Sequence, residues 1–165
     1  MKRQIRLGTF ETNSSAMHTL SISNKGLSKC RLKVHDDGYV HISLDQEFGK
    51  DDNVFFTQKD KLKYIVTWLY SYYDFDLEEI EEGYLWRDFN EEFANYVNKD
   101  RDETDNLCLG VKVDSCKYED AWSYWDHQIY DGKWNDDGCV VSLWNAKKCV
   151  EFIFNKYISL VTGCD

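Results

Sequence analysis

Apolar and polar residues alternate along several short segments in the first third of the chain. Residues 19–23 and 39–44 place an apolar side chain at every second position, which is the period of a half-buried β-strand. Residues 3–7 and 30–34 also read as short strands. The Asp-Gly pair at 37–38 separates 30–34 from 39–44 and tolerates the positive φ of a tight turn. The pattern therefore predicts four strands, of which the last two form a β-hairpin.

Helical periodicity replaces this alternation after residue 56. Thr57, with an acidic residue three positions later, is a variant of the capping box that begins helices. The apolar residues that follow recur at helical spacing and define one buried stripe: Leu62, Ile65, Val66, Leu69 and Tyr72. A second helical apolar face runs over residues 77–97, and Gly83 is expected to interrupt it. Asn145 is expected to cap a further helix over residues 146–154.

Three more strands are predicted at residues 107–113, 139–144 and 157–162. The resulting order, β-β-β-β-α-α-β-β-α-β, is typical of an α+β protein. The sequence contains no proline and therefore no rigid linker that would divide it. We expect a single domain over residues 1–165, with a mostly antiparallel β-sheet, two central helices and one helix near the C-terminus. The order of the strands in the sheet stays open.

Charge is distributed unevenly along the chain. The net charge is −10, and residues 74–137 hold 20 acidic and 6 basic residues, a net of −14 for that region. The field of such a region repels phosphate backbones, so direct nucleic-acid binding is disfavoured. A basic protein surface is the expected partner. The alternative is that the acidic side chains serve solubility alone.

The six cysteines are scattered and form neither a Cys-x-x-Cys pair nor a Cys/His set with zinc-finger spacing. We expect no metal and no cofactor. The first residues carry no apolar stretch typical of an export signal, and no apolar run approaches the roughly 18–20 residues of a membrane span. We therefore expect reduced thiols in a cytoplasmic protein that does not enter a membrane.

A polar segment at residues 10–18 lies between two predicted strands. It contains Ser14, Ser15 and His18, whose hydroxyl and imidazole groups could bind a phosphate or combine as a nucleophile and its base. The alternative is a turn in which these side chains satisfy their own backbone.

A second polar segment at residues 125–131 contains adjacent Asp126 and His127. The pair could act as acid–base groups or as metal ligands. Neighbouring side chains usually point apart, however, so a shared site needs groups from elsewhere in the fold. The alternative is a loop histidine with local hydrogen bonds.

Residues 6–18 resemble the opening of a family of small, poorly characterised bacteriophage proteins. They read Arg-Leu-Gly-Thr-Phe-Glu-Thr-Asn-Ser-Ser-Ala-Met-His, whereas the family reads Arg-x-x-x-Phe-Glu-Thr-Asn-Ser-Ser-Ser-x-His, so Ala16 replaces a serine. The similarity returns in residues 126–128, 152–155 and 158–165. It implies a phage gene expressed in the cytoplasm of a bacterial host cell. It also implies that the shared polar residues form a functional site or a buried polar hub: Asn13, Ser14, Ser15, His18, Asp126 and His127.

The first functional hypothesis is a phage-encoded acidic binding protein. It would be an anti-defence inhibitor, similar to acidic anti-CRISPR proteins, that occupies a basic nucleic-acid-binding surface of a host protein. The expected contacts lie on the second helical segment, mostly opposite its apolar face: Glu78, Glu79, Glu81, Glu82, Glu91 and Glu92. A merely solvated helix face would show the same pattern.

The second hypothesis is a small enzyme that acts on a nucleotide or on a nucleic-acid modification. Its catalytic groups would be Ser14, Ser15, His18, Asp126 and His127, which requires that two polar segments more than 100 residues apart meet in one pocket. A virion or packaging component is a third class that the sequence leaves open.

Overall fold

The structure is a computed structural model that describes residues 19–20, 26–45, 53–72, 77–102, 105–117, 145–157 and 159–162. The strands in these residues are β1 (Thr19–Leu20), β2 (Tyr39–Leu44), β3 (Asn53–Phe55), β4 (Gly110–Cys116) and β5 (Leu160–Thr162). The helices are α1 (Gln58–Tyr72), α2 (Leu77–Glu82), α3 (Tyr84–Asn98) and α4 (Ala146–Phe154). None of these helices has the length and apolar character needed to cross a membrane.

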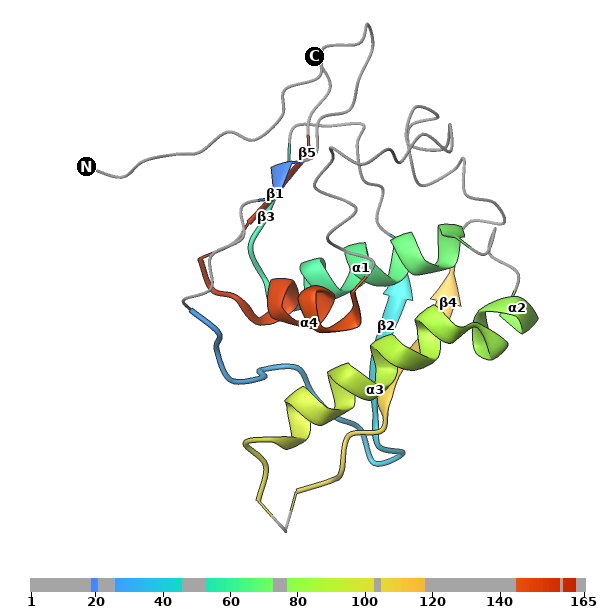
Figure 1. The fold of residues 1–165 in the computed structure, drawn as a ribbon, viewed down its shortest axis with the longest axis vertical. Coiled ribbons are helices and arrows are strands. Elements are labelled where there is room, and N and C mark those ends of the chain that lie inside the picture. Colours follow the sequence, from blue (N-terminus) through green and yellow to red (C-terminus); the bar gives the residue numbers. More distant parts are fainter. Residues whose placement is uncertain are drawn as a thin grey trace, which may run out of the picture.

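The described strands belong to two sheets. Strands β2 and β4 pair in parallel, from Tyr39 beside Gly110 to Leu44 beside Cys116, with a shift of register after Ile42. Strand β5 lies between β1 and β3 and is antiparallel to both. Helices α1 and α4 lie side by side, and α3 packs against α4 and β4 (Figure 1).

The predicted mostly antiparallel sheet is wrong, although the described residues are of α+β type. The longest strands, with 6 and 7 residues, are parallel, and antiparallel pairing is confined to strands of 2 or 3 residues. Alternation of apolar residues records which face is buried and says nothing of the direction of the partner strand. The described residues also contain four helices rather than three, because Gly83 separates α2 from α3.

The turn predicted at residues 37–38 is confirmed, but the predicted hairpin is wrong. The N–H of Gly38 donates to the carbonyl of His35 over 2.9 Å, and Gly38 has a φ of +84°. One backbone bond crosses the turn, from the N–H of His35 to the carbonyl of Tyr39 over 2.9 Å, but residues 30–34 pair with no described strand. Other backbone donors before the turn bond to helices instead. The N–H of Ser28 donates to the carbonyl of Phe154 over 2.9 Å, and the N–H of Arg31 donates to Oε1 of Gln58 over 2.8 Å.

Two of the other predicted strands are present with shifted starts, and two lie outside the described residues. Residues 3–7 and 139–144 lie outside the described residues. Strand β4 begins at Gly110 rather than at residue 107, and β5 begins at Leu160 rather than at residue 157. These differences are of the size expected when boundaries are inferred from periodicity alone.

The predicted helix starts at Thr57 and Asn145 are confirmed by their caps. Oγ1 of Thr57 accepts from the N–H of Asp60 over 3.1 Å, and Oδ1 of Asn145 accepts from the N–H of Lys148 over 3.2 Å. Each oxygen satisfies one of the backbone donors that a helix start leaves free.

Helix α1 is buried on more than the one predicted stripe. Leu62, Ile65, Val66 and Leu69 are buried as expected, and further residues around the helix are buried as well: Lys61, Tyr64, Thr67, Trp68 and Tyr70. The helix contacts both α4 and β2. It is therefore a central element of the core, and its buried lysine is an exception among charged side chains.

Aromatic rings connect α3 to α4. Leu85, Phe89, Phe93 and Val97 are the buried residues of α3, which confirms the predicted apolar face. The Tyr96 ring stacks on Phe154 at 4.3 Å between centroids, and Phe93 lies 5.7 Å from the same ring. This aromatic contact fixes α3 against α4 and leaves the opposite side of α3 facing solvent.

Two asparagines of α3 hold the segment that leads into and begins β4. Asn98 accepts from the N–H of Cys108 and donates to its carbonyl, both over 2.8 Å. Oδ1 of Asn90 accepts from the N–H of Val111 over 2.7 Å. These bonds position α3 on the strand pair, and with it the acidic side chains that α3 carries.

Candidate functional site

The acidic residues expected to contact a partner lie on α2 and α3. These helices together contain seven acidic residues and one basic residue. We define the acidic helical surface as their exposed members: Glu79, Glu81, Glu82, Asp88, Glu91 and Glu92. Glu78 also lies in α2. Because α2 buries Ile80 completely and α3 buries its aromatic face, both helices are held by packing while their carboxylates reach solvent.

The acidic helical surface also carries an exposed aromatic ring. Tyr84, at the start of α3, has 54% of its surface exposed, whereas the nearby Trp86 packs at 5.5 Å against Tyr70 of α1. The basic residue of these helices, Arg87, lies 3.9 Å from the Asp88 carboxylate, and both side chains are largely exposed. Such an exposed pair neutralises little of the surface.

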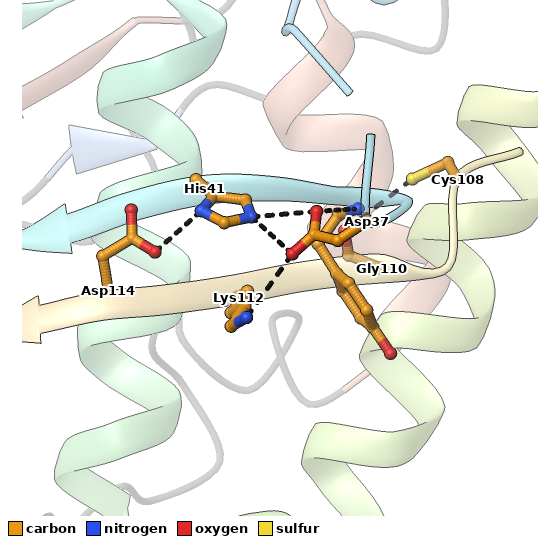
Figure 2. A network of polar contacts seen from close by, with 7 residues as sticks. Asp37, His41, Cys108, Gly110, Lys112 and Asp114 are labelled. Atoms are coloured by element: carbon orange, nitrogen blue, oxygen red, sulfur yellow. Dashed lines mark hydrogen bonds and ion pairs between the residues drawn. The ribbon is translucent and has the colours of Figure 1, made fainter. Parts of the chain in front are cut away.

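A second polar arrangement surrounds His41 on β2 (Figure 2). Nε2 of His41 lies 3.0 and 2.9 Å from the two carboxylate oxygens of Asp37, and Nδ1 lies 2.7 Å from Oδ1 of Asp114. Nζ of Lys112 lies 3.4 Å from the same Asp37 carboxylate. The ring of His35 lies 4.4 Å from the His41 ring. We call these five residues the His41 cluster.

The strand pairing explains this arrangement. Val40, Ile42 and Leu44 are buried, so the alternation of β2 places His41 on the opposite face. Lys112 is the direct neighbour of His41 in the parallel register, and Asp114 lies two residues further along β4. Sequence reasoning missed this cluster. The one local signal was the spacing of four residues between Asp37 and His41.

Asp37 is ionised more readily than an ordinary aspartate. Partial desolvation raises its pKa, but the hydrogen bonds from His41, from the N–H of Tyr39 and from Lys112 together lower the pKa below its usual value. An acceptor with three donors is therefore present at the turn before β2.

The residues proposed for an enzymatic site lie outside the described residues: Asn13, Ser14, Ser15, His18, Asp126 and His127. The expectation that residues 13–18 meet residues 126–127 stays a prediction. Within the described part of the chain, no group of three or more His, Cys, Asp or Glu side chains could hold a metal ion.

Among the described residues, Cys30, Cys108, Cys116 and Cys149 carry thiols rather than disulfide bonds. Burial raises the pKa of the Cys149 thiol to about 12, and burial also raises the pKa values of Cys30 and Cys108. A thiol that keeps its proton is a poor nucleophile. These three buried or half-buried thiols are therefore unsuited to catalysis.

The sequence predicts six reduced cysteines, and the structure predicts the order in which the four described ones react. Among these four, a thiol reagent should modify exposed Cys116 first in the native protein and should leave Cys149 unmodified until the protein unfolds. After denaturation without reductant, titration should find six thiols. A lower total would indicate a disulfide, and early modification of Cys149 would contradict its burial.

Comparisons with known proteins give no matching family model, no matching curated protein and no matching solved structure. The similarity of residues 6–18 to bacteriophage proteins therefore stays a prediction from the sequence.

Proposed function

We propose that this protein binds a basic surface of a partner protein through the acidic helical surface. One observation carries the proposal: α2 and α3 contain seven acidic residues and one basic residue, and the apolar sides of both helices are buried. Carboxylates held on packed helices present a fixed negative pattern, which attracts a basic surface and orients it. Exposed Tyr84 would supply an aromatic anchor at the same surface.

We further propose that the partner is a nucleic-acid-binding protein, whose basic surface the carboxylates occupy in place of phosphates. An anti-defence role in a phage-infected bacterium is the specific form of this proposal, and it is supported by the resemblance of residues 6–18. The same negative field disfavours direct binding to nucleic acid.

The test is charge reversal on α2. Glu78, Glu79, Glu81 and Glu82 are changed together to lysine, and binding of the immobilised protein to nucleic-acid-binding proteins of a bacterial lysate is compared with that of the wild type. For any captured partner, we expect the dissociation constant to rise roughly 100-fold or more, because each reversal replaces attraction by repulsion. We also expect wild-type binding to weaken steeply as salt is raised.

A matched control reverses four exposed aspartates outside α2 and α3 to lysine: Asp36, Asp100, Asp102 and Asp105. This variant undergoes the same change in net charge but keeps the acidic helical surface. Circular dichroism of both variants checks that the fold is intact. Partners retained equally by both variants, or binding that is indifferent to salt, would contradict the proposal.

A further inference from the structure

We propose that His41 connects the turn before β2 to strand β4 only when both of its ring nitrogens carry protons. The imidazolium then donates to Asp37 in the turn and to Asp114 on β4, and we call this arrangement the latch. The latch lies on the outer face of the β2–β4 pair and consists of His41, Asp37, Lys112 and Asp114 (Figure 2). It does not depend on the acidic helical surface and stands apart from the proposed binding function.

The number of hydrogen-bond donors on an imidazole ring depends on its protonation state. A neutral ring has one N–H donor and one nitrogen lone pair, whereas an imidazolium has two donors. Both nitrogens of His41 face carboxylate oxygens, at 2.7 Å on the Asp114 side and at 2.9 and 3.0 Å on the Asp37 side. An ionised carboxylate accepts and cannot donate, so a neutral ring would direct a lone pair against one of the two anions.

Charge balance supports the protonated form. The groups that face His41 are Asp37 from the turn, Lys112 and Asp114 from β4, and the ring of His35 from the segment before the turn. With His41 protonated and His35 neutral, two carboxylates are balanced by one ammonium and one imidazolium. Loss of the His41 proton leaves one negative charge in excess, and a charge on His35 would oppose the charge on His41.

One proton therefore connects three segments of the chain. Asp37 lies in the turn, His41 on β2 and Asp114 on β4. The same turn contacts the segment before β4, because the N–H of Leu109 donates to the carbonyl of Gly38 over 2.7 Å. Release of Asp37 by the neutral ring removes one of the three donors that hold this carboxylate, and so loosens the contact of the turn with this segment, which carries the exposed side chain of Leu109.

The test combines two nuclear magnetic resonance measurements on the full chain across the range in which histidines titrate, about pH 5 to 8. Nitrogen-15 spectra of the imidazole report whether both ring nitrogens of His41 carry protons. Amide hydrogen exchange reports the opening of the Leu109 N–H. We expect two protonated nitrogens at the acidic end. As His41 loses its proton, we expect Leu109 exchange, corrected for its intrinsic pH dependence, to rise about tenfold, the size expected for one charge-assisted hydrogen bond.

Three variants separate the latch from general pH effects. His41→Gln should remove the pH-dependent step in Leu109 exchange, and Asp114→Asn should reduce it, whereas the control His35→Gln should retain it. A single protonated nitrogen of His41 throughout the range would overturn the proposal, as would a step that persists in His41→Gln. If His41→Gln does not fold, two measurements still test the proposal: the nitrogen-15 spectrum of the wild-type imidazole and the pH-dependent step in Leu109 exchange in Asp114→Asn.

Discussion

Between pH 8 and pH 10.5, the wild-type protein should gain roughly 3 kcal/mol of unfolding free energy relative to a Lys61→Met variant. Lys61 has only 1% of its surface exposed, and desolvation lowers its pKa from 10.5 to about 8. Its Nζ donates to the carbonyl of Asn155 over 2.7 Å and lies 5.6 Å from the centre of the Phe152 ring. The lysine therefore links α1 to the end of α4 from inside the core.

The sign follows from proton binding in the two states. Below pH 8, folded and unfolded chains both hold the Lys61 proton, and the buried charge opposes folding by a constant amount. Between pH 8 and 10.5 the folded state releases the proton while the unfolded state keeps it, so stability rises with pH. Above pH 10.5 both states are neutral and the gain is complete.

Denaturant unfolding at several pH values measures this gain as a difference between the two proteins. Other groups, such as Cys149 with its pKa of about 12, lower the stability at high pH, but they act in both proteins and cancel. Loss of the bond to Asn155 adds a constant offset. Lys59→Met, at an exposed position of α1, is the control and should follow the wild type. If the difference in unfolding free energy between the wild type and Lys61→Met did not change with pH, the Lys61 ammonium would not be desolvated in the folded protein.

Phe154→Ala should lower the free energy of unfolding by about 3–5 kcal/mol. The Phe154 side chain is completely buried, stacks on Tyr96 and contacts Phe93, so truncation leaves a cavity between α3 and α4. The Phe154 carbonyl keeps its bonds from the N–H and hydroxyl of Ser28, at 2.9 and 2.7 Å, because they involve only the backbone of residue 154. The loss therefore reports packing alone.

Thermal or denaturant unfolding measures the effect, and Phe56→Ala is the matched control. Phe56 has 68% of its surface exposed, so its truncation should change stability by less than about 0.5 kcal/mol. Equal effects of the two substitutions would show that the aromatic contact between α3 and α4 is not a main source of stability.

Local signals in the sequence were sufficient to locate the helices. The Thr57 and Asn145 caps, the break at Gly83 and the apolar face of α3 each depend on residues within a few positions of one another. Strand partners depend on distant residues instead. Tyr39 pairs with Gly110, and no property of residues 39–44 specifies a parallel neighbour from beyond three helices.

The acidic helical surface could be predicted from local sequence, whereas the His41 cluster could not. Exposure of Glu91 and Glu92 follows from helical periodicity, because the buried positions of α3 determine which side faces solvent. The His41 cluster was missed because Asp114 reaches His41 only through the β2–β4 register. The burial of Lys61 was also missed, since a charged residue adjoining a helical stripe is ordinarily assigned to solvent.

The parallel β2–β4 pair has a consequence for how the chain folds. Pairing Tyr39 with Gly110 closes a loop of about 70 residues, and the loss of chain entropy in this closure opposes the pairing of the two strands. During synthesis β2 leaves the ribosome well before β4. The apolar residues of β2 therefore lack the partner strand for a time: Val40, Ile42 and Leu44. Helix α1 contacts β2 and follows it closely in the chain, so it can cover this strand early. A nascent chain that stalls before residue 110 would present the open edge of β2, and an open strand edge is prone to aggregation.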